Sequence, residues 1–275
     1  MAQAYINGTE LFYATIGEGI RCLVMHGGLG FDHTYLHPWL DPLGDTLQLN
    51  YYDHRGNGRS GRPDKETMTH AQFAADADAL AVLLGHEKVA VLGHSYGGFI
   101  ALEFALRHPN RLSHLILLDT APTFNYGDEI MENALRQAQR QSNTDEILAV
   151  LQEDWSTDEE KHARFPIIWP IYFKNFDSDI GARLLANSIV TVSGGAREGE
   201  LKAYNVIPRL GEIQTPTLIL AGREDWVCPP SKAHILHDGI PNSELVIFED
   251  SGHLPYVEES ELFFRTVRNW FKRTI

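Results

Sequence analysis

Residues 88–98, KVAVLGHSYGG, constrain the fold of this chain more than any other stretch. A short, wholly apolar run before Gly93 is typical of a strand buried on both faces of a parallel sheet. The segment that follows has helical spacing, and Ser95 stands between Gly93 and Gly97 at the junction. A sharp strand-to-helix turn forces its central residue into strained backbone geometry, and small neighbours relieve the crowding. The pattern therefore predicts Ser95 as a nucleophile at the carboxyl end of a strand.

Strand-like and helix-like segments alternate along most of the chain. Residues 5–17 read as two strands joined at Asn7-Gly8, a strong hairpin signal. Further apolar strands are predicted within 21–28, 47–58, 112–122, 215–225 and 243–253, and helices within 70–85 and 259–275. This alternation predicts an α/β fold in which helices cover a mostly parallel, twisted sheet.

The middle of the chain interrupts this alternation. Residues 123–210 are rich in Gln, Asn, Glu and Trp, have helical periodicity and contain no clear buried strand. We expect them to form a helical cap subdomain, inserted into a core domain made of residues 1–122 and 211–275. An aromatic-rich cap suits an apolar substrate group. The candidate substrate-binding residues are Leu29, Phe124, Trp155, Trp169 and Tyr172. The competing interpretation is that the cap aromatics form the small core of the cap itself.

Charge and cysteine content narrow the class of partner. The formal net charge of -14 disfavours nucleic acid and anionic membranes, because both require a basic face. The two cysteines, Cys22 and Cys228, form no CxxC pair, which predicts neither a zinc site nor a disulfide framework. No signal-peptide pattern and no apolar run near the roughly 18 residues of a membrane span are found. We expect a cytoplasmic protein that needs no cofactor or metal, and the oligomeric state is left open.

A serine nucleophile needs a base, and the base needs an orienting acid. In this type of fold the chain order is Ser, then Asp or Glu, then His. Asp225 follows the strand in TLILAGRED, and His253 follows the last strand, so both are expected on the same sheet edge as Ser95. Glu224 and Asp119 remain alternative acids, and Asp119 can equally cap a turn.

Acyl transfer also needs two hydrogen-bond donors aimed at the developing oxyanion. The backbone N–H of Tyr96, the residue after the nucleophile, is one candidate. The other is expected in the glycine-rich loop LVMHGGLG, with Gly28 as the first choice and Leu29 as its competitor. A phosphate-binding role for this loop is disfavoured, because no GK[ST] sequence follows it.

Taken together, the motifs resemble the α/β-hydrolase superfamily over essentially the whole chain. They are HGGLG at 26–30, DHRGNGRS at 53–60, GHSYGG at 93–98, GREDWVCPP at 222–230 and SGHLPY at 251–256. The resemblance implies a Ser95–Asp225–His253 triad and a helical cap. Within the superfamily, the chain is similar to the proline-iminopeptidase-like branch. Its departures from HGGPG, DQRGSGRS and GxSWGS at Leu29, His54, Asn57 and Tyr96 favour the esterases and lactonases of this background, acyl-homoserine lactonases included.

Three functions follow from the sequence. The leading one is a serine hydrolase of carboxylic esters or lactones, with N-acyl-homoserine lactones among the candidate small-molecule substrates. The second is a proline iminopeptidase-type aminopeptidase with the same triad, in which acidic residues of the segment 154–160 receive the substrate ammonium. The third is a non-catalytic ligand receptor on the same scaffold.

Overall fold

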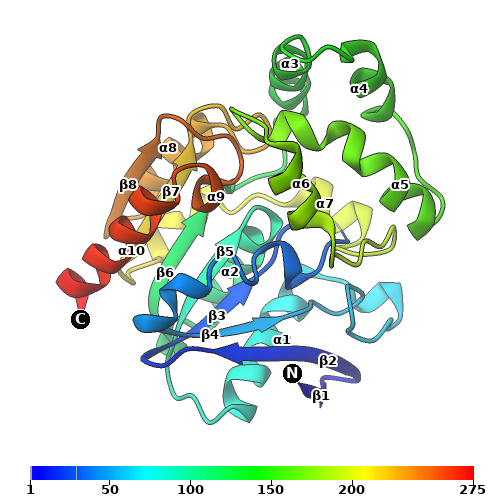
Figure 1. Ribbon diagram of the computed structural model, residues 1–275. Coiled ribbons are helices and arrows are strands. Elements are labelled where there is room, and N and C mark those ends of the chain that lie inside the picture. The colour runs from blue at the N-terminus through cyan, green and yellow to red at the C-terminus, as the bar shows by residue number, and fades with distance from the viewer. Residues whose placement is uncertain (1, 29) are drawn as a thin grey trace.

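An eight-stranded sheet forms the centre of the computed structural model, which describes residues 2–28 and 30–275, without the side chain of Glu198. The strand order is β1-β2-β4-β3-β5-β6-β7-β8 (Figure 1). The strands are β1 (Ala2–Ile6), β2 (Thr9–Ile16), β3 (Ile20–Met25), β4 (Leu47–Tyr52), β5 (Val89–His94), β6 (Leu112–Leu118), β7 (Thr217–Gly222) and β8 (Ser243–Phe248). From β4 to β8 all neighbouring strands are parallel, as the sequence predicted.

The N-terminal hairpin is the antiparallel part of the sheet. β1 pairs with β2, and β2 continues the sheet by pairing with β4. Asn7 and Gly8 connect the two strands with φ angles of 48° and 83°. Asn-Gly is the pair that tolerates positive φ at both positions of such a turn. The predicted hairpin is therefore confirmed.

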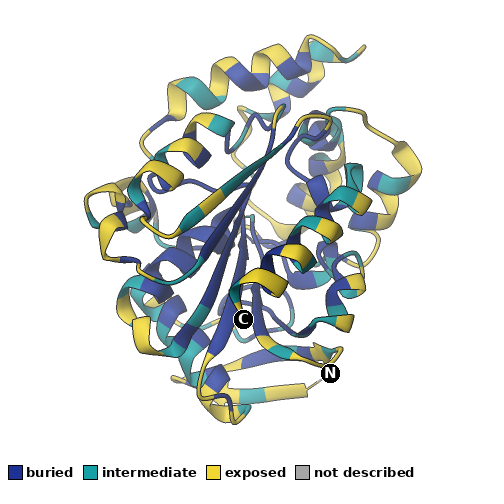
Figure 2. Ribbon diagram, turned by 90° about the vertical axis from the view of Figure 1, so that its left-hand side faces the viewer, coloured by how far each residue is buried: buried dark blue, intermediate teal, exposed yellow. Residues whose placement is uncertain are grey.

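Helices cover both faces of the sheet. The helices of the chain are α1 (His70–Leu83), α2 (Tyr96–Arg107), α3 (Gly127–Ala138), α4 (Thr144–Val150), α5 (Asp158–Ile168), α6 (Ser178–Leu185), α7 (Glu198–Ala203), α8 (Pro230–Gly239), α9 (Pro255–Glu258) and α10 (Ser260–Thr274). Helices α1, α2 and α8 share one apolar cluster with Val89 and Val91 of β5. Helix α10 shares the other cluster with the alternate residues Ala90 and Leu92. The strands are consequently buried between two helical layers (Figure 2).

The segment between β6 and β7 holds α3 to α7, and no strand is assigned within it. Its two ends meet at an isolated antiparallel bridge between Thr123 and Asn205. The helices lie above the arrowheads of the parallel strands, shown in green to yellow in Figure 1. The segment therefore covers the sheet edge at which the strands end. Across residues 2–28 and 30–275, no helix has both the length and the apolar character needed to cross a bilayer.

Candidate active site

Ser95 occupies the turn between β5 and α2 with a backbone that side-chain-bearing residues rarely adopt. Its φ is 54° and its ψ is -122°. Neighbouring segments hold this conformation: the Ser95 N–H donates to Leu118 O at 2.9 Å, and the Thr120 hydroxyl donates to Ser95 O at 2.6 Å. A positive φ costs free energy at a serine. It persists here because these hydrogen bonds from the end of β6 hold the backbone in place.

Steric contacts explain why glycines flank Ser95. A Cβ on Gly93 would lie 2.5 Å from Gly97 O, and a Cβ on Gly97 would lie 2.1 Å from Met25 O. A Cβ on Gly98 would in turn collide with the side chain of Thr120. The glycines thus allow α2 to start directly against the ends of β3, β5 and β6. The motif is required by this packing, whatever chemistry the serine performs.

His253 and Asp225 are brought together from the loops after β8 and β7. His253 Nδ1 lies 2.7 Å from Asp225 Oδ2, and both residues are buried. The other carboxylate oxygen, Asp225 Oδ1, accepts the N–H groups of Val227 and Cys228. The N–H of His253 donates to Tyr172 O at 2.7 Å, which ties this loop to the segment between β6 and β7. Asp225 thus holds the imidazole of His253 through Nδ1, and Nε2 is the ring nitrogen that this contact does not use.

The two alternative acids have other surroundings. Glu224 is directed away from the histidine, toward Gln137 and Arg140. Asp119 follows β6 with a φ of 45°, is fully buried and accepts the Gly222 N–H at 2.8 Å. Burial, and then the charge of Asp225, raise the pKa of Asp119 well above its usual range. Asp119 is therefore a buried acid close enough to Asp225 to feel its charge, and its Oδ2 has no hydrogen-bond partner among the described residues.

A buried chain of hydrogen bonds that the sequence did not reveal links the connection between β3 and β4, the end of β5 and the loop after β8. The Gly27 N–H donates to the Tyr35 hydroxyl at 2.6 Å, and this hydroxyl lies 2.7 Å from His94 Nδ1. His94 Nε2 lies 3.0 Å from the carbonyl of His253, so Nε2 carries the proton and Nδ1 accepts from Tyr35. Burial, and then the nearby His253, keep the pKa of His94 well below its usual value. Tyr35 gave no sequence signal, because it is remote in the chain from His94.

The glycine loop after β3 approaches Ser95 closely. A Cβ on Gly27 would lie 2.6 Å from Ser95 Cβ, but the Gly27 N–H is already bonded to Tyr35. Gly28 follows with a φ of 65° and lines the same cavity as Ser95 and Tyr96. Tyr96 is the first residue of α2, where N–H groups lack intrahelical acceptors. Leu29, the competing donor and a candidate substrate-binding residue, lies outside the described residues.

A cavity of about 500 Å³ opens at Ser95 and His253. The expected substrate-binding residues Phe124, Trp155, Trp169 and Tyr172 all line it. Asp225 does not line it, since it lies behind His253. Most of the remaining wall is also aromatic or aliphatic, through Phe31, Tyr35, Phe99, Tyr126, Ile130, Leu151, Phe165, Ile168, Leu201, Trp226, Val227 and Leu254. Many residues of this wall come from the segment between β6 and β7.

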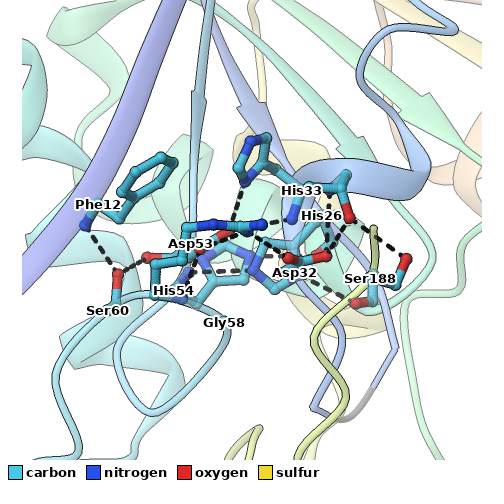
Figure 3. Close-up of polar contacts among 12 residues, drawn as sticks. Phe12, His26, Asp32, His33, Asp53, His54, Gly58, Ser60 and Ser188 are labelled. Carbon is cyan, nitrogen blue, oxygen red and sulfur yellow. Dashed lines mark hydrogen bonds and ion pairs between the residues drawn. The ribbon is translucent and has the colours of Figure 1, made fainter. Parts of the chain in front are cut away.

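A second buried polar network supports the loops beside the site (Figure 3). His33 Nδ1 lies 2.6 Å from Asp53 Oδ1, and the Arg59 backbone N–H donates to Asp53 Oδ2 at 2.8 Å. The Arg59 side chain reaches Asp32 at 2.6 Å. Burial disfavours ionised Asp53, but the hydrogen bond and charge of His33 outweigh it and lower the pKa of the carboxyl. Arg55 pairs separately with Asp76 of α1. None of these residues lines the cavity.

Two buried groups among the described residues have metal-compatible spacing: Asp32, His33 and Asp53, and Asp225, Cys228 and His253. In both groups the carboxylates already accept hydrogen bonds from the protein. Burial also raises the pKa of the Cys228 thiol well above its usual value, whereas a metal ligand must be the thiolate. Both groups are accounted for by hydrogen bonding alone.

Comparisons with known proteins identify the family. The sequence profile of the alpha/beta hydrolase fold matches residues 22–260, so this chain belongs to the α/β-hydrolase family, as its motifs predicted. The proline iminopeptidase PfmaB of Pestalotiopsis fici is 28% identical over 98% of this chain and 98% of its own. A thermophilic esterase from Thermogutta terrifontis is 25% identical, with a TM-score of 0.77, over 100% and 99% of the two chains. Est816, described as an N-acyl homoserine lactone degrading enzyme, is 24% identical, with a TM-score of 0.74, over 98% and 99%. The chain is accordingly a hydrolase of this fold.

Proposed function

We propose that this chain is a serine hydrolase of carboxylic esters or lactones. Ser95 acts as nucleophile, His253 as general base and acid, and Asp225 as the group that orients the histidine. The 2.7 Å contact between His253 Nδ1 and Asp225 Oδ2, beside a serine of positive φ, supports these roles. Ser95 and His253 line one cavity, as attack on a bound carbonyl requires.

The chemistry proceeds through an acyl-enzyme. His253 Nε2 takes the proton of the Ser95 hydroxyl as its oxygen attacks the substrate carbonyl. The N–H groups of Gly28 and Tyr96 stabilise the oxyanion of the tetrahedral intermediate. His253 then protonates the leaving alkoxide, which departs as an alcohol or, for a lactone, as the free end of the same molecule. Water, deprotonated by His253, attacks the acyl-enzyme and releases the acid.

The character of the cavity wall is the observation that favours esters and lactones. No Asp or Glu occurs among the described residues that line the cavity. An aminopeptidase must receive the α-ammonium group of its substrate, and an apolar wall without a carboxylate cannot compensate that charge. The acidic residues suggested for this role (Asp154, Asp158, Glu159 and Glu160) all lie outside the lining. The fold likeness to Est816 makes acyl-homoserine lactones a substrate worth testing.

Residues 123–210 act in this proposal as a cap that selects the substrate. They supply Phe124, Trp155, Trp169 and Tyr172 to the cavity, whereas the core domain, 1–122 and 211–275, supplies the reacting groups. The aminopeptidase remains the second candidate because PfmaB, a proline iminopeptidase, is similar over nearly the full chain.

A substrate panel tests the proposal. We expect Ser95-dependent hydrolysis of p-nitrophenyl butyrate or N-hexanoyl-homoserine lactone and little cleavage of proline β-naphthylamide. Ser95→Ala should lower kcat by about 10⁴-fold or more, since it removes the nucleophile. Preferred cleavage of the proline amide would reverse the order of the two enzymes. Ligand binding without turnover on any ester, lactone or amide would instead favour the receptor.

A further inference from the structure

One charged side chain is built into the apolar cavity. Among the described residues that line it, Lys161 of α5 is the only Lys, Arg, Asp or Glu. The residue is only 8% exposed, and its Nζ donates to Thr191 O at 3.0 Å. Lysine is seldom buried to this depth unless its ammonium group is paired, because removing that group from water is costly. Lys161 therefore brings a charged side chain to a wall that is otherwise mostly apolar.

The amine lies against the glycine loop that also flanks the nucleophile. A Cβ on Gly30 would be 3.0 Å from Lys161 Nζ, and a Cβ on Gly27 would be 2.6 Å from Ser95 Cβ. Thr191, which accepts from the lysine, donates its own N–H to Gly30 O at 2.7 Å. Lys161 and Ser95 thus line one cavity, and each lies against a different part of the same short loop.

No Asp or Glu beside Lys161 is among the described residues that line the cavity. Asp158, one turn earlier in α5, acts on Lys161 through its charge, but its Oδ1 accepts the Val192 N–H at 2.8 Å. The titratable groups on the cavity side, besides Lys161, are those of His94, His253, Cys228, Tyr35, Tyr96, Tyr126 and Tyr172. Burial, only partly offset by Asp158, lowers the pKa of Lys161 to about 8. The amine is therefore mostly cationic at neutral pH and loses its charge in a mildly alkaline solution.

We infer that Lys161 binds a carboxylate on the substrate, so that the preferred substrates are esters or lactones with an apolar chain and a free carboxylate. This inference rests on the proposed function and specifies its substrate class. The ammonium and carboxylate form a charge-assisted hydrogen bond in a cavity of low polarity, and the aromatic wall holds the chain. An alternative role for Lys161 is to link the cap to the glycine loop through Thr191, and the experiments below separate the two.

Binding is measured first, in the Ser95→Ala protein, so that the result does not depend on catalysis. Hexanoate and hexanamide have the same chain and differ in charge, and Trp155, Trp169 and Trp226 in the wall report binding by fluorescence. We expect hexanoate to bind at least tenfold more tightly than hexanamide at pH 7. Lys161→Met should remove this preference, and Lys161→Arg should retain part of it. Lys88→Met, which removes an exposed charge at the opposite end of β5, should leave it unchanged.

The pH dependence tests the same lysine without altering it. In Ser95→Ala, hexanoate affinity should decrease above pH of about 8, as Lys161 deprotonates, while hexanamide affinity stays constant. Equal affinities for the acid and the amide at pH 7, or hexanoate affinity that is constant up to pH 10, would overturn the inference.

Turnover then tests the substrate class. The first pair is 4-butyryloxybenzoate, which carries its carboxylate on the alcohol side, and the corresponding methyl ester. The second pair is p-nitrophenyl hydrogen adipate, which carries its carboxylate on the acyl side, and the corresponding methyl ester. For at least one pair, Lys161→Met should lower the ratio of kcat/KM for acid over ester by about ten- to a hundredfold. Equal losses for both members of each pair would assign Lys161 to holding the loop. Absence of Ser95-dependent turnover on every ester would refute the proposed function, while the hexanoate titration would still decide on the lysine.

Discussion

The sheet edge and the segment that covers it form the same cavity in different ways. At the edge, Ser95, His94 and His253 are buried and fixed by hydrogen bonds that involve backbone atoms of β5, β6 and the loop after β8. In the covering segment, short helices present aromatic side chains to the cavity, and the outer face of α3 leaves Met131 45% and Leu135 42% exposed.

The proposed chemistry depends on the sheet edge, and the proposed selectivity depends on the covering segment. A strand end within a packed sheet has few alternative conformations, so it can hold reacting groups in a fixed arrangement. The helices of the covering segment carry none of the proposed reacting groups, so side chains that they present to the cavity can change at lower cost to the chemistry. We therefore expect changes at the edge to lower kcat for every substrate, and changes in the covering segment to alter the choice among substrates.

Asp225→Asn, at the sheet edge, is expected to reduce activity most. The N–H groups of Val227 and Cys228 hold the amide oxygen at the Oδ1 position, so the amide NH₂ faces His253 Nδ1 and donates to it. The imidazole then takes the wrong tautomer, and kcat should decrease by about 10⁴-fold. Asp119→Asn is the matched control, because it makes the same carboxylate-to-amide change at a buried acid whose Oδ1 accepts the Gly222 N–H instead of contacting the imidazole. Its kcat should remain within about tenfold of the parent enzyme. A larger loss at Asp119 than at Asp225 would make Asp119 the orienting acid.

A smaller effect is expected from breaking the chain between the loops. His94→Phe removes the acceptor of the Tyr35 O–H and the donor to the His253 carbonyl, which should cost about 2 kcal/mol of unfolding free energy. It should also lower kcat about tenfold for short and long esters alike, since the loop of the base becomes less fixed. His114→Phe removes another buried histidine, on β6 and outside the cavity lining. The midpoint of thermal unfolding and kcat are measured for both variants. An equal loss of kcat in His94→Phe and His114→Phe would show that His94 has no special role in holding the loop of the base.

The smallest effect is expected in the covering segment. Trp155→Ala removes a half-buried part of the cavity wall, so kcat/KM for p-nitrophenyl octanoate should decrease about tenfold through lost apolar contact. The value for p-nitrophenyl acetate should change less than twofold. If both esters were affected equally, the division between a reacting edge and a selecting cap would be wrong.

Short patterns in the sequence predicted much of this structure. The Asn7-Gly8 turn, the apolar strands and the glycines around Ser95 each depend on short-range rules of backbone geometry and burial. Those rules predicted the hairpin and the helix-covered parallel sheet. They also placed Ser95, Asp225 and His253 after strands, because parallel strands end at a common edge.

Contacts between residues that are remote in the chain could not be predicted and became visible only in the folded protein. The sequence left Asp119, Glu224 and Asp225 as possible acids, and only the packing of β7 beside β8 brings Asp225 to His253. It gave no sign of the Tyr35–His94 contact or of Lys161 in an apolar wall. Periodicity reports which face of an element is buried, but it does not report which distant side chain that face will meet. That pairing is set by how the elements pack in three dimensions, and in this chain it determines the acid partner of His253 and the charge within the cavity.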